Sequence, residues 1–266
     1  MRPLFCFIDD SVFELDVFKK NIVPTAQGVD FILASTYEQT LEEIGSRYPA
    51  LFILDLYGRD PDLDAKGVPA KKELAVEINS IASLDSIYEG LEDHAQDKVN
   101  EFLKRMFHLT DAWRSLFSRV FRATGQNINY GLGNLTAARQ DFPSSAAVAY
   151  TRKSMITDAV EAVAAGFNGL NLKPDGPNDE EIHRVTASRA PDLLNAWSNL
   201  VTQHFTDHLR RLALKLFWSG LYDDARRLKE GTEISSKGQA IIGAVNLSFL
   251  KAAADWAEYT GQQWEF

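Results

Sequence analysis

Short, uninterrupted runs of apolar residues alternate with more polar segments over the first part of the chain. The apolar runs cover residues 4–8, 31–34 and 51–54, and helical patterns at 11–21 and 36–46 separate them. Continuous apolar runs are typical of strands that are buried on both faces, and intervening helices let such strands run parallel. The pattern therefore predicts the beginning of a parallel α/β sheet.

Both of these early helices have a polar residue where a helix N-cap is expected. Ser11 precedes the first helical pattern and Thr36 the second. A Ser or Thr hydroxyl at the N-cap accepts a hydrogen bond from a backbone N–H of the first turn, and an acidic residue three positions later completes a capping box. Glu14 occupies that position after Ser11. We expect the first helix to begin here.

The middle of the chain changes character, because residues 60–129 contain no strand pattern. Residues 67–93 and 96–123 each carry apolar side chains at helical spacing, and the second stripe is wide. Its members are Val99, Phe102, Leu103, Met106, Trp113, Leu116, Phe117, Val120 and Phe121. Two long helices joined near His94 predict a helical hairpin inserted into the α/β pattern.

The alternation of helix and strand patterns then resumes. Residues 132–140 and 154–165 have helical periodicity, whereas 147–150 and 169–172 are expected to be strands. With the three earlier runs, these two complete a predicted five-stranded parallel sheet.

The last part of the chain is predicted to be all helical. A turn-rich linker at residues 175–179 precedes helical patterns at 192–217, 222–229 and 238–257. The predicted organisation has three parts: an α/β domain of residues 1–60 plus 130–175, a helical insertion of residues 61–129, and a helical C-terminal region of residues 176–266.

Composition narrows the function classes. The formal net charge of −9 makes nucleic acid an unlikely main partner, because proteins that bind phosphate backbones are usually basic. Cys6 is the only cysteine, so an internal disulfide is excluded. We expect a cytoplasmic protein without membrane insertion: the N-terminal apolar run is too short for a signal peptide, and the apolar stretch at 240–257 contains charged residues.

The polar residues that follow the predicted strands carry the chemistry. In an open parallel sheet the carboxyl ends of the strands form one crevice, where ligands bind. Three carboxylates that meet there repel one another unless a hard cation joins them, and Mg²⁺ takes oxygen ligands of this kind. A hydroxyl and an amine beside such a cation suit a phosphoryl group. The residues at these positions are Asp9, Asp10, Asp55, Thr151 and Lys173.

These residues lie in four short motifs, namely Phe-Ile-Asp-Asp at 7–10, Ile-Leu-Asp at 53–55, Ala-Tyr-Thr at 149–151 and Leu-Lys-Pro at 172–174. In this order and spacing they resemble the receiver domain of two-component response regulators. The resemblance covers about residues 3–60 and 130–175. It implies a flavodoxin-like, doubly wound, five-stranded parallel sheet, interrupted by the helical insertion and followed by the all-α C-terminal region.

The resemblance also implies roles for individual residues. Asp55 is the expected phosphoacceptor, and a sensor histidine kinase or a phosphotransfer protein is the expected donor. Thr151 and Lys173 would bind the phosphoryl oxygens. Mg²⁺ would be held by Asp9, Asp10, Asp55 and the backbone carbonyl of Tyr57. No enzymatic activity is expected beyond self-phosphorylation from small donors and autodephosphorylation.

Two departures from the receiver pattern stand out. Leu170 occupies the position three before Lys173, which is often aromatic in receivers. The loop after the acceptor strand is expanded by the helical insertion. Each departure bears on the kinetics of phosphorylation, and a degenerate receiver that acts as a phosphorylation-independent interaction module is therefore an alternative.

The output of such a protein is expected to pass through its helical parts, by contact with a protein effector or by homodimerisation. A DNA-binding transcriptional regulator that uses the C-terminal helices is the second alternative. His204 and His208 lie four residues apart in this region, a spacing that suits metal binding, but without a third ligand we expect packing or capping roles.

Overall fold

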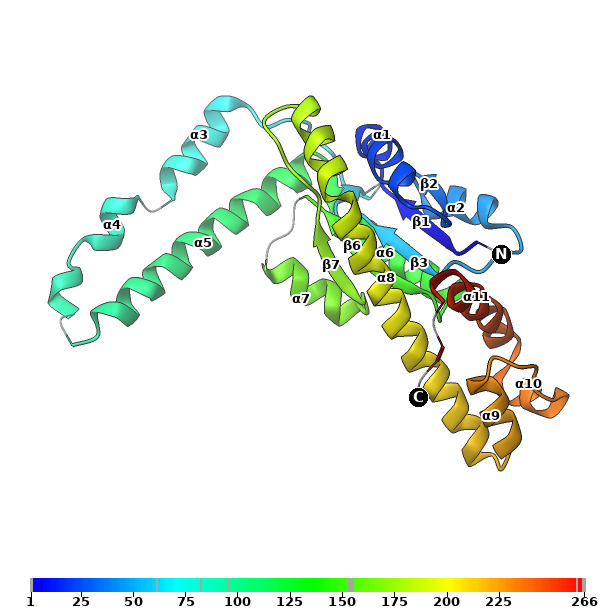
Figure 1. Cartoon of the computed structure of the whole chain (residues 1–266). Helices are drawn as coiled ribbons and strands as arrows, with labels where there is room; N and C mark the ends of the chain where they lie inside the picture. Colours follow the sequence, from blue (N-terminus) through cyan, green and yellow to red (C-terminus); the bar gives the residue numbers. More distant parts are fainter. Residues whose placement is uncertain are drawn as a thin grey trace. The chain divides into compact units, whose positions relative to one another are not determined.

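The protein was analysed as a computed structural model (Figure 1). The structure describes residues 2–60, 62–81, 83–94, 96–152, 156–261 and 263–264. The chain divides into two compact units. The first combines residues 1–58 with 128–266, and the second is the insertion, residues 59–127.

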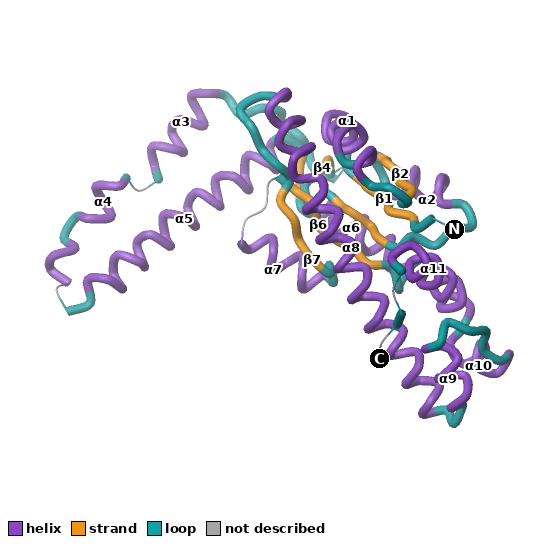
Figure 2. Tube along the Cα trace, in the orientation of Figure 1, coloured by secondary structure: helices purple, strands orange, loops and turns teal. Residues whose placement is uncertain are grey.

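A five-stranded sheet forms the centre of the first unit (Figure 2). Its strands are β1 (Leu4–Ile8), β2 (Asp30–Ala34), β3 (Leu51–Leu54), β6 (Ala146–Thr151) and β7 (Gly169–Leu172). All neighbouring strands pair in parallel, in the spatial order β2-β1-β3-β6-β7. This is the strand order of the flavodoxin-like, doubly wound fold, as predicted, and its switch point lies between β1 and β3.

Helices cover both faces of this sheet. The bounds of the α/β helices are α1 (Val12–Asn21), α2 (Tyr37–Ile44), α6 (Asn129–Asp141) and α7 (Ile156–Ala165), with a 3-10 turn, η1 (Val23–Thr25). Successive side chains of β1 point to opposite faces of the sheet. Phe5 and Phe7 join the core beneath α1, whereas Leu4, Cys6 and Ile8 join the core beneath α2, α6 and α7.

The C-terminal helices share the first of these cores. They are α8 (Asp179–Trp218), α9 (Tyr222–Lys229), α10 (Ser236–Ile242) and α11 (Ala244–Thr260). Trp197 of α8 is fully buried and stacks on Phe18 of α1 with ring centroids 5.9 Å apart. Trp256 of α11 stacks on Phe5 of β1 at 5.9 Å. The region after residue 175 thus packs as a continuation of the sheet's own core.

Two C-terminal helix boundaries differ from the sequence interpretation. Helix α8 begins at Asp179, well before residue 192, and continues through Pro191. The side chain of Asn178 accepts the Glu181 N–H as N-cap, and the buried residues on both sides of Pro191 offset the hydrogen bond that proline removes. The predicted helix at 238–257 is two helices, because Gly243 has φ +85° and breaks the run.

The insertion is a helical hairpin, as expected. Its first arm, predicted as one helical segment at residues 67–93, is divided into three short helices. The insertion contains α3 (Lys71–Ser80), α4 (Leu84–Tyr88), η2 (Leu91–His94) and α5 (Lys98–Ala123). Arg105 of α5 donates to the carbonyls of Ile87 and Glu89 at 3.0 and 2.6 Å, which holds α5 to the end of α4. Short strands β4 (Gly58–Arg59) and β5 (Gln126–Asn127) pair where the insertion begins and ends. Periodicity could not reveal strands of two residues.

Across the part of the chain that the structure describes, every helix is too short or too polar to cross a membrane.

Candidate functional site

The predicted site residues lie at one edge of the sheet because hydrogen bonds of the strand ladders continue past the strand ends. The N–H of Asp9 donates to the Ala34 carbonyl at 3.1 Å, and the N–H of Asp55 donates to the Ile8 carbonyl at 3.0 Å. At the other side, the N–H of Lys173 donates to the Thr151 carbonyl at 3.0 Å. These backbone hydrogen bonds position the main chain of the site independently of its side chains.

The three carboxylates meet as predicted. One oxygen from each of Asp9, Asp10 and Asp55 lies within 4.8 Å of the other two. Asp9 and Asp55 are buried, with 0% and 4% of their surface exposed, whereas Asp10 is partly exposed. Backbone donors orient the two buried groups: the Ser11 N–H donates to Asp9 Oδ1 at 2.9 Å, and the Leu56 N–H to Asp55 Oδ1 at 3.0 Å.

Lys173 brings the balancing charge to this cluster. Its side chain is 3% exposed and forms an ion pair with Asp9. Its Nζ also lies 3.4 Å from Asp55 Oδ1 and 3.8 Å from Glu14 Oε2. A buried ammonium is stable only with such partners. The sequence prediction that Lys173 reaches the acceptor carboxylate is consistent with this geometry.

The electrostatics of the site show an excess of negative charge. Burial alone would lower the pKa of Lys173, but three surrounding carboxylates outweigh it and raise that pKa. Burial raises the pKa of Asp9, and the Lys173 ammonium offsets only part of that rise. One fixed cation thus faces several carboxylates. A divalent cation would relieve this imbalance, and the donor atoms are of the kind that Mg²⁺ prefers.

Thr151 and Tyr57 complete the predicted set. Thr151 is the last residue of β6, beside β7, and is fully buried. Tyr57 follows Asp55 in the same loop and is partly buried. The role of the Tyr57 carbonyl as a metal ligand stays a prediction. Leu170 lies on β7 and packs against the core beneath α2, α6 and α7.

Two residues near the site were not predicted to take part. Glu14, which the sequence marks as a capping residue, does donate its N–H to Ser11 Oγ at 3.4 Å, but its carboxylate points elsewhere. Glu14 Oε1 accepts from Arg152 Nη2 at 2.9 Å, and Arg152 Nη1 also pairs with Asp175 at 2.9 Å. Arg152 directly follows Thr151, so this ion pair links α1 to the loops that carry Thr151 and Lys173.

Gly131 of α6 packs directly against the backbone of the acceptor loop, residues 55–57. Its N–H donates to the Leu56 carbonyl at 3.0 Å. A Cβ at this position would lie 2.5 Å from the Asp55 carbonyl oxygen and 2.6 Å from the Leu56 Cα. Only glycine allows α6 to approach the backbone of the phosphoacceptor candidate this closely.

His204 and His208 of α8 have structural partners. His208 Nε2 lies 2.9 Å from Ser144 Oγ and 3.0 Å from Asn246 Oδ1, and His204 Nε2 lies 3.2 Å from the Ser144 carbonyl oxygen. Burial lowers the pKa of His204 to about 4 and also lowers the pKa of His208. The pair therefore fastens α8 and α11 to the start of β6 as neutral rings, in line with the expected packing role.

Among the comparisons with known proteins, the one with solved structures found similar proteins. No protein-family model matches the sequence, and no curated protein matches it. Solved structures do match. One is a response regulator receiver domain protein (CheY-like) from Methanospirillum hungatei, with 13% identity and a TM-score of 0.35, covering 74% of this chain and 99% of that one. The strand order of this chain, β2-β1-β3-β6-β7, is that of the flavodoxin-like, doubly wound fold.

Two further receiver structures illustrate the similarity. The chemotaxis response regulator CheY4 of Vibrio cholerae has 12% identity and a TM-score of 0.35, with 71% of this chain and 99% of that chain covered. A response regulator protein from Burkholderia pseudomallei, with a phosphorylated aspartic acid, a calcium ion and citrate, has 14% identity and a TM-score of 0.33, with 86% and 93% covered.

Proposed function

We propose that this protein is a response-regulator-like signalling protein whose Asp55 accepts a phosphoryl group from the phosphohistidine of a sensor kinase or phosphotransfer protein. The position of Asp55 carries this proposal. It follows β3, at the centre of the sheet, and its carboxylate lies close to those of Asp9 and Asp10 and 3.4 Å from the ammonium of Lys173.

Asp9, Asp10 and Asp55, with the backbone carbonyl of Tyr57, would hold Mg²⁺. The fit rests on the donor set: three carboxylate oxygens within 4.8 Å of one another, one of them on a residue whose pKa burial raises. When bound, the cation would neutralise charge on the transferring phosphoryl group.

The residues of the chain supply the rest of the chemistry. A carboxylate oxygen of Asp55 forms the new P–O bond as the P–N bond to the donor imidazole breaks, and the imidazole leaves and takes a proton. The Lys173 ammonium neutralises charge on the phosphoryl oxygens, and the Thr151 hydroxyl donates a hydrogen bond to one of them. No catalytic turnover is proposed beyond self-phosphorylation from small donors and autodephosphorylation, and the proposed compartment is the cytoplasm.

The helical insertion is the proposed output, through an effector protein or a second copy of the chain. Both of its ends adjoin the acceptor loop, because the backbones of Leu56 and Gly131 are hydrogen-bonded to each other. Helix α5 carries apolar side chains in water, with Val99 71% and Phe107 73% exposed. A shift of the acceptor loop on phosphorylation would thus be passed to an element with surface available for a partner.

Phosphorylation by acetyl phosphate with Mg²⁺, followed by intact-mass measurement, tests the proposal. Wild type should gain one phosphoryl group that is lost in base, and Asp55→Asn should gain none. Asp16→Asn, which changes a carboxylate on the surface of α1, is the matched control and should behave as wild type. Phosphorylation of Asp55→Asn to the wild-type level, or no phosphorylation of the wild type, would refute the assignment.

A further inference from the structure

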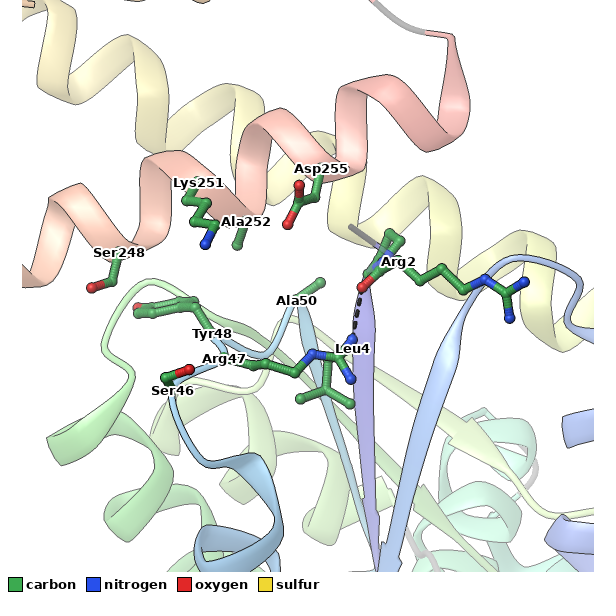
Figure 3. A pocket seen from close by; sticks show the side chains of 11 residues that line it. Arg2, Leu4, Ser46, Arg47, Tyr48, Ala50, Ser248, Lys251, Ala252 and Asp255 are labelled. Atoms are coloured by element: carbon green, nitrogen blue, oxygen red, sulfur yellow. Dashed lines mark hydrogen bonds between the residues drawn. The ribbon is translucent and has the colours of Figure 1, made fainter. Parts of the chain in front are cut away.

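A small cavity lies where β1 and β3 begin, at the opposite end of these strands from Asp55. Helix α11 forms one wall, and the segments that lead into the two strands form the other (Figure 3). Its volume is about 90 Å³. At the 10–15 Å³ that one water-sized sphere requires, this leaves room for roughly six non-hydrogen atoms.

Two cationic side chains face this cavity, those of Arg47 and Lys251; Arg2 also lines it, but its guanidinium points away (Figure 3). Arg47 is held in place, because its Nη2 donates to the Arg2 carbonyl at 2.7 Å and pairs with Asp30 at 2.9 Å. Lys251 is different. Among the described residues no hydrogen bond or ion pair engages its ammonium, which points from α11 toward Tyr48 (Figure 3).

The other residues that line the cavity limit the charge and the chemical type of an anion that could bind there. Leu4, Ala50 and Ala252 provide a buried apolar surface. Asp255 closes one end of the cavity, and Asp30 already neutralises part of the charge on Arg47. Because Arg47 is partly neutralised, the positive charge that remains, mainly on Lys251, suits one negative charge. The cavity thus combines a site for one anionic group with room for a few apolar carbons.

We propose that this cavity binds a short-chain monocarboxylate, with the carboxylate between Lys251 and Arg47 and the carbons on Leu4, Ala50 and Ala252. Such a ligand would contact α11 and the beginning of the sheet at the same time. It would therefore stabilise the docked position of α11, because a ligand that binds only the folded arrangement shifts the equilibrium toward it. This inference does not depend on phosphorylation of Asp55.

Calorimetric titration of the full chain with propionate and butyrate tests the proposal, with propionamide as the neutral isostere and inorganic phosphate as the alternative anion. Saturable binding of the carboxylates, and none of propionamide, is expected. Lys251→Met should weaken propionate binding at least about tenfold, the effect of losing one charge-assisted hydrogen bond. Lys237→Met on α10 and Asp55→Asn should bind propionate as wild type does.

Hydrogen exchange on the wild-type protein provides a second measurement that does not require Lys251→Met to fold. Propionate should slow exchange of the amides of residues 244–260 relative to the same concentration of chloride. Absence of saturable binding, equal binding of propionamide, tighter binding of phosphate, or an unchanged affinity in a folded Lys251→Met would each overturn the proposal. Equal protection of residues 244–260 by chloride would do so as well.

Discussion

Arg152 and Glu14, which lie 138 positions apart in the sequence, are joined by two hydrogen bonds to a single oxygen. Both Nε and Nη2 of the guanidinium donate to Glu14 Oε1, at 3.3 and 2.9 Å. The other oxygen of the same carboxylate lies 3.8 Å from Lys173 Nζ. Glu14 thus connects the residue after Thr151 with the lysine that faces Asp55.

We predict that Glu14→Gln lowers the free energy of unfolding by about 1.5–3 kcal/mol, the range for hydrogen bonds to charged groups. Glu14 and Arg152 have side chains that are 15% and 21% exposed, so water screens the pair only in part. Urea unfolding measures the change. Asp16→Asn breaks the exposed pair with Lys20 and should cost close to nothing. Equal effects of the two substitutions would contradict the idea.

Lys173→Met should be strongly destabilised in EDTA, by about 3 kcal/mol, because Asp9 and Asp55 lose their buried counter-charge. Mg²⁺ should restore more stability to this variant than to wild type, since the cation would replace the missing positive charge. Thermal unfolding with EDTA and with Mg²⁺ measures both effects. A shift of the melting temperature by Mg²⁺ that is the same in the two proteins would argue against a shared site.

Gly131→Ala should lower stability by about 1–3 kcal/mol, the cost of forcing an extra methyl group into a packed site. The new Cβ would meet the backbone of Asp55 and Leu56, which cannot rotate away as a side chain can. Phosphorylation from acetyl phosphate should also slow, because the acceptor loop has to move.

Gly133→Ala is the matched control for that prediction. It lies on the same helix, and nothing is within 4 Å of its Cβ position. The substitution should therefore raise stability by about 0.5–1 kcal/mol, as expected from helix propensity. Chemical unfolding of both variants decides the matter, and a Gly131→Ala protein as stable as Gly133→Ala would show that the loop yields without strain.

The contribution of His204 to the free energy of unfolding should fall as the pH drops from about 6.5 to about 4. The pKa of His204 is lowered in the folded protein to about 4, so in this interval the unfolded chain binds a proton at this residue that the native chain does not. This contribution rises with pH by up to about 1.4 kcal/mol per pH unit, whereas the raised pKa of Asp9 acts in the opposite direction, so the histidine is isolated by comparison with a variant. His204→Gln should have a shallower pH dependence than wild type by that amount. Urea unfolding at several pH values would refute the prediction if the two slopes agree.

Replacement of residues 62–127 by a short Gly/Ser linker should leave a folded protein that still accepts phosphate. The first unit has its own cores, and the hydrogen bond between Leu56 and Gly131 keeps the two attachment points together. If the insertion is the output, phosphorylation should change the oligomeric state of the full chain and not of the deletion variant. Light scattering with and without acetyl phosphate measures this, and an identical response of the two proteins would exclude the insertion from that role.

Local sequence patterns were sufficient to predict those strands whose burial is visible in their own residues. The apolar runs located β1 and β3 because strands buried on both faces show no polar interruption. The site residues followed from these strands, since the carboxyl ends of parallel strands meet at one edge.

The sequence patterns did not reveal features that depend on contacts between residues far apart in the sequence. The ion pair of Glu14 and Arg152 forms only after β1 and β6 are placed in the sheet, so neither residue has a signal of its own. The helix predicted at 192–217 begins earlier, at Asp179, because buried residues of α8 outweigh the cost of Pro191 within the helix. The surface that those residues cover could not be inferred from the helical periodicity of α8, and the C-terminal region was therefore interpreted as a separate part.

The burial of Trp197 between Phe18 and Tyr150 has a consequence for how such a protein can be rearranged by evolution or by an engineer. Signalling modules that are joined by linkers can be recombined, because a cut in the linker leaves each hydrophobic interior intact. In this chain, a cut after residue 175 would pass through an interior and leave Phe18 and Tyr150 facing water. The α/β portion and its C-terminal helices must therefore be inherited, transplanted and unfolded together.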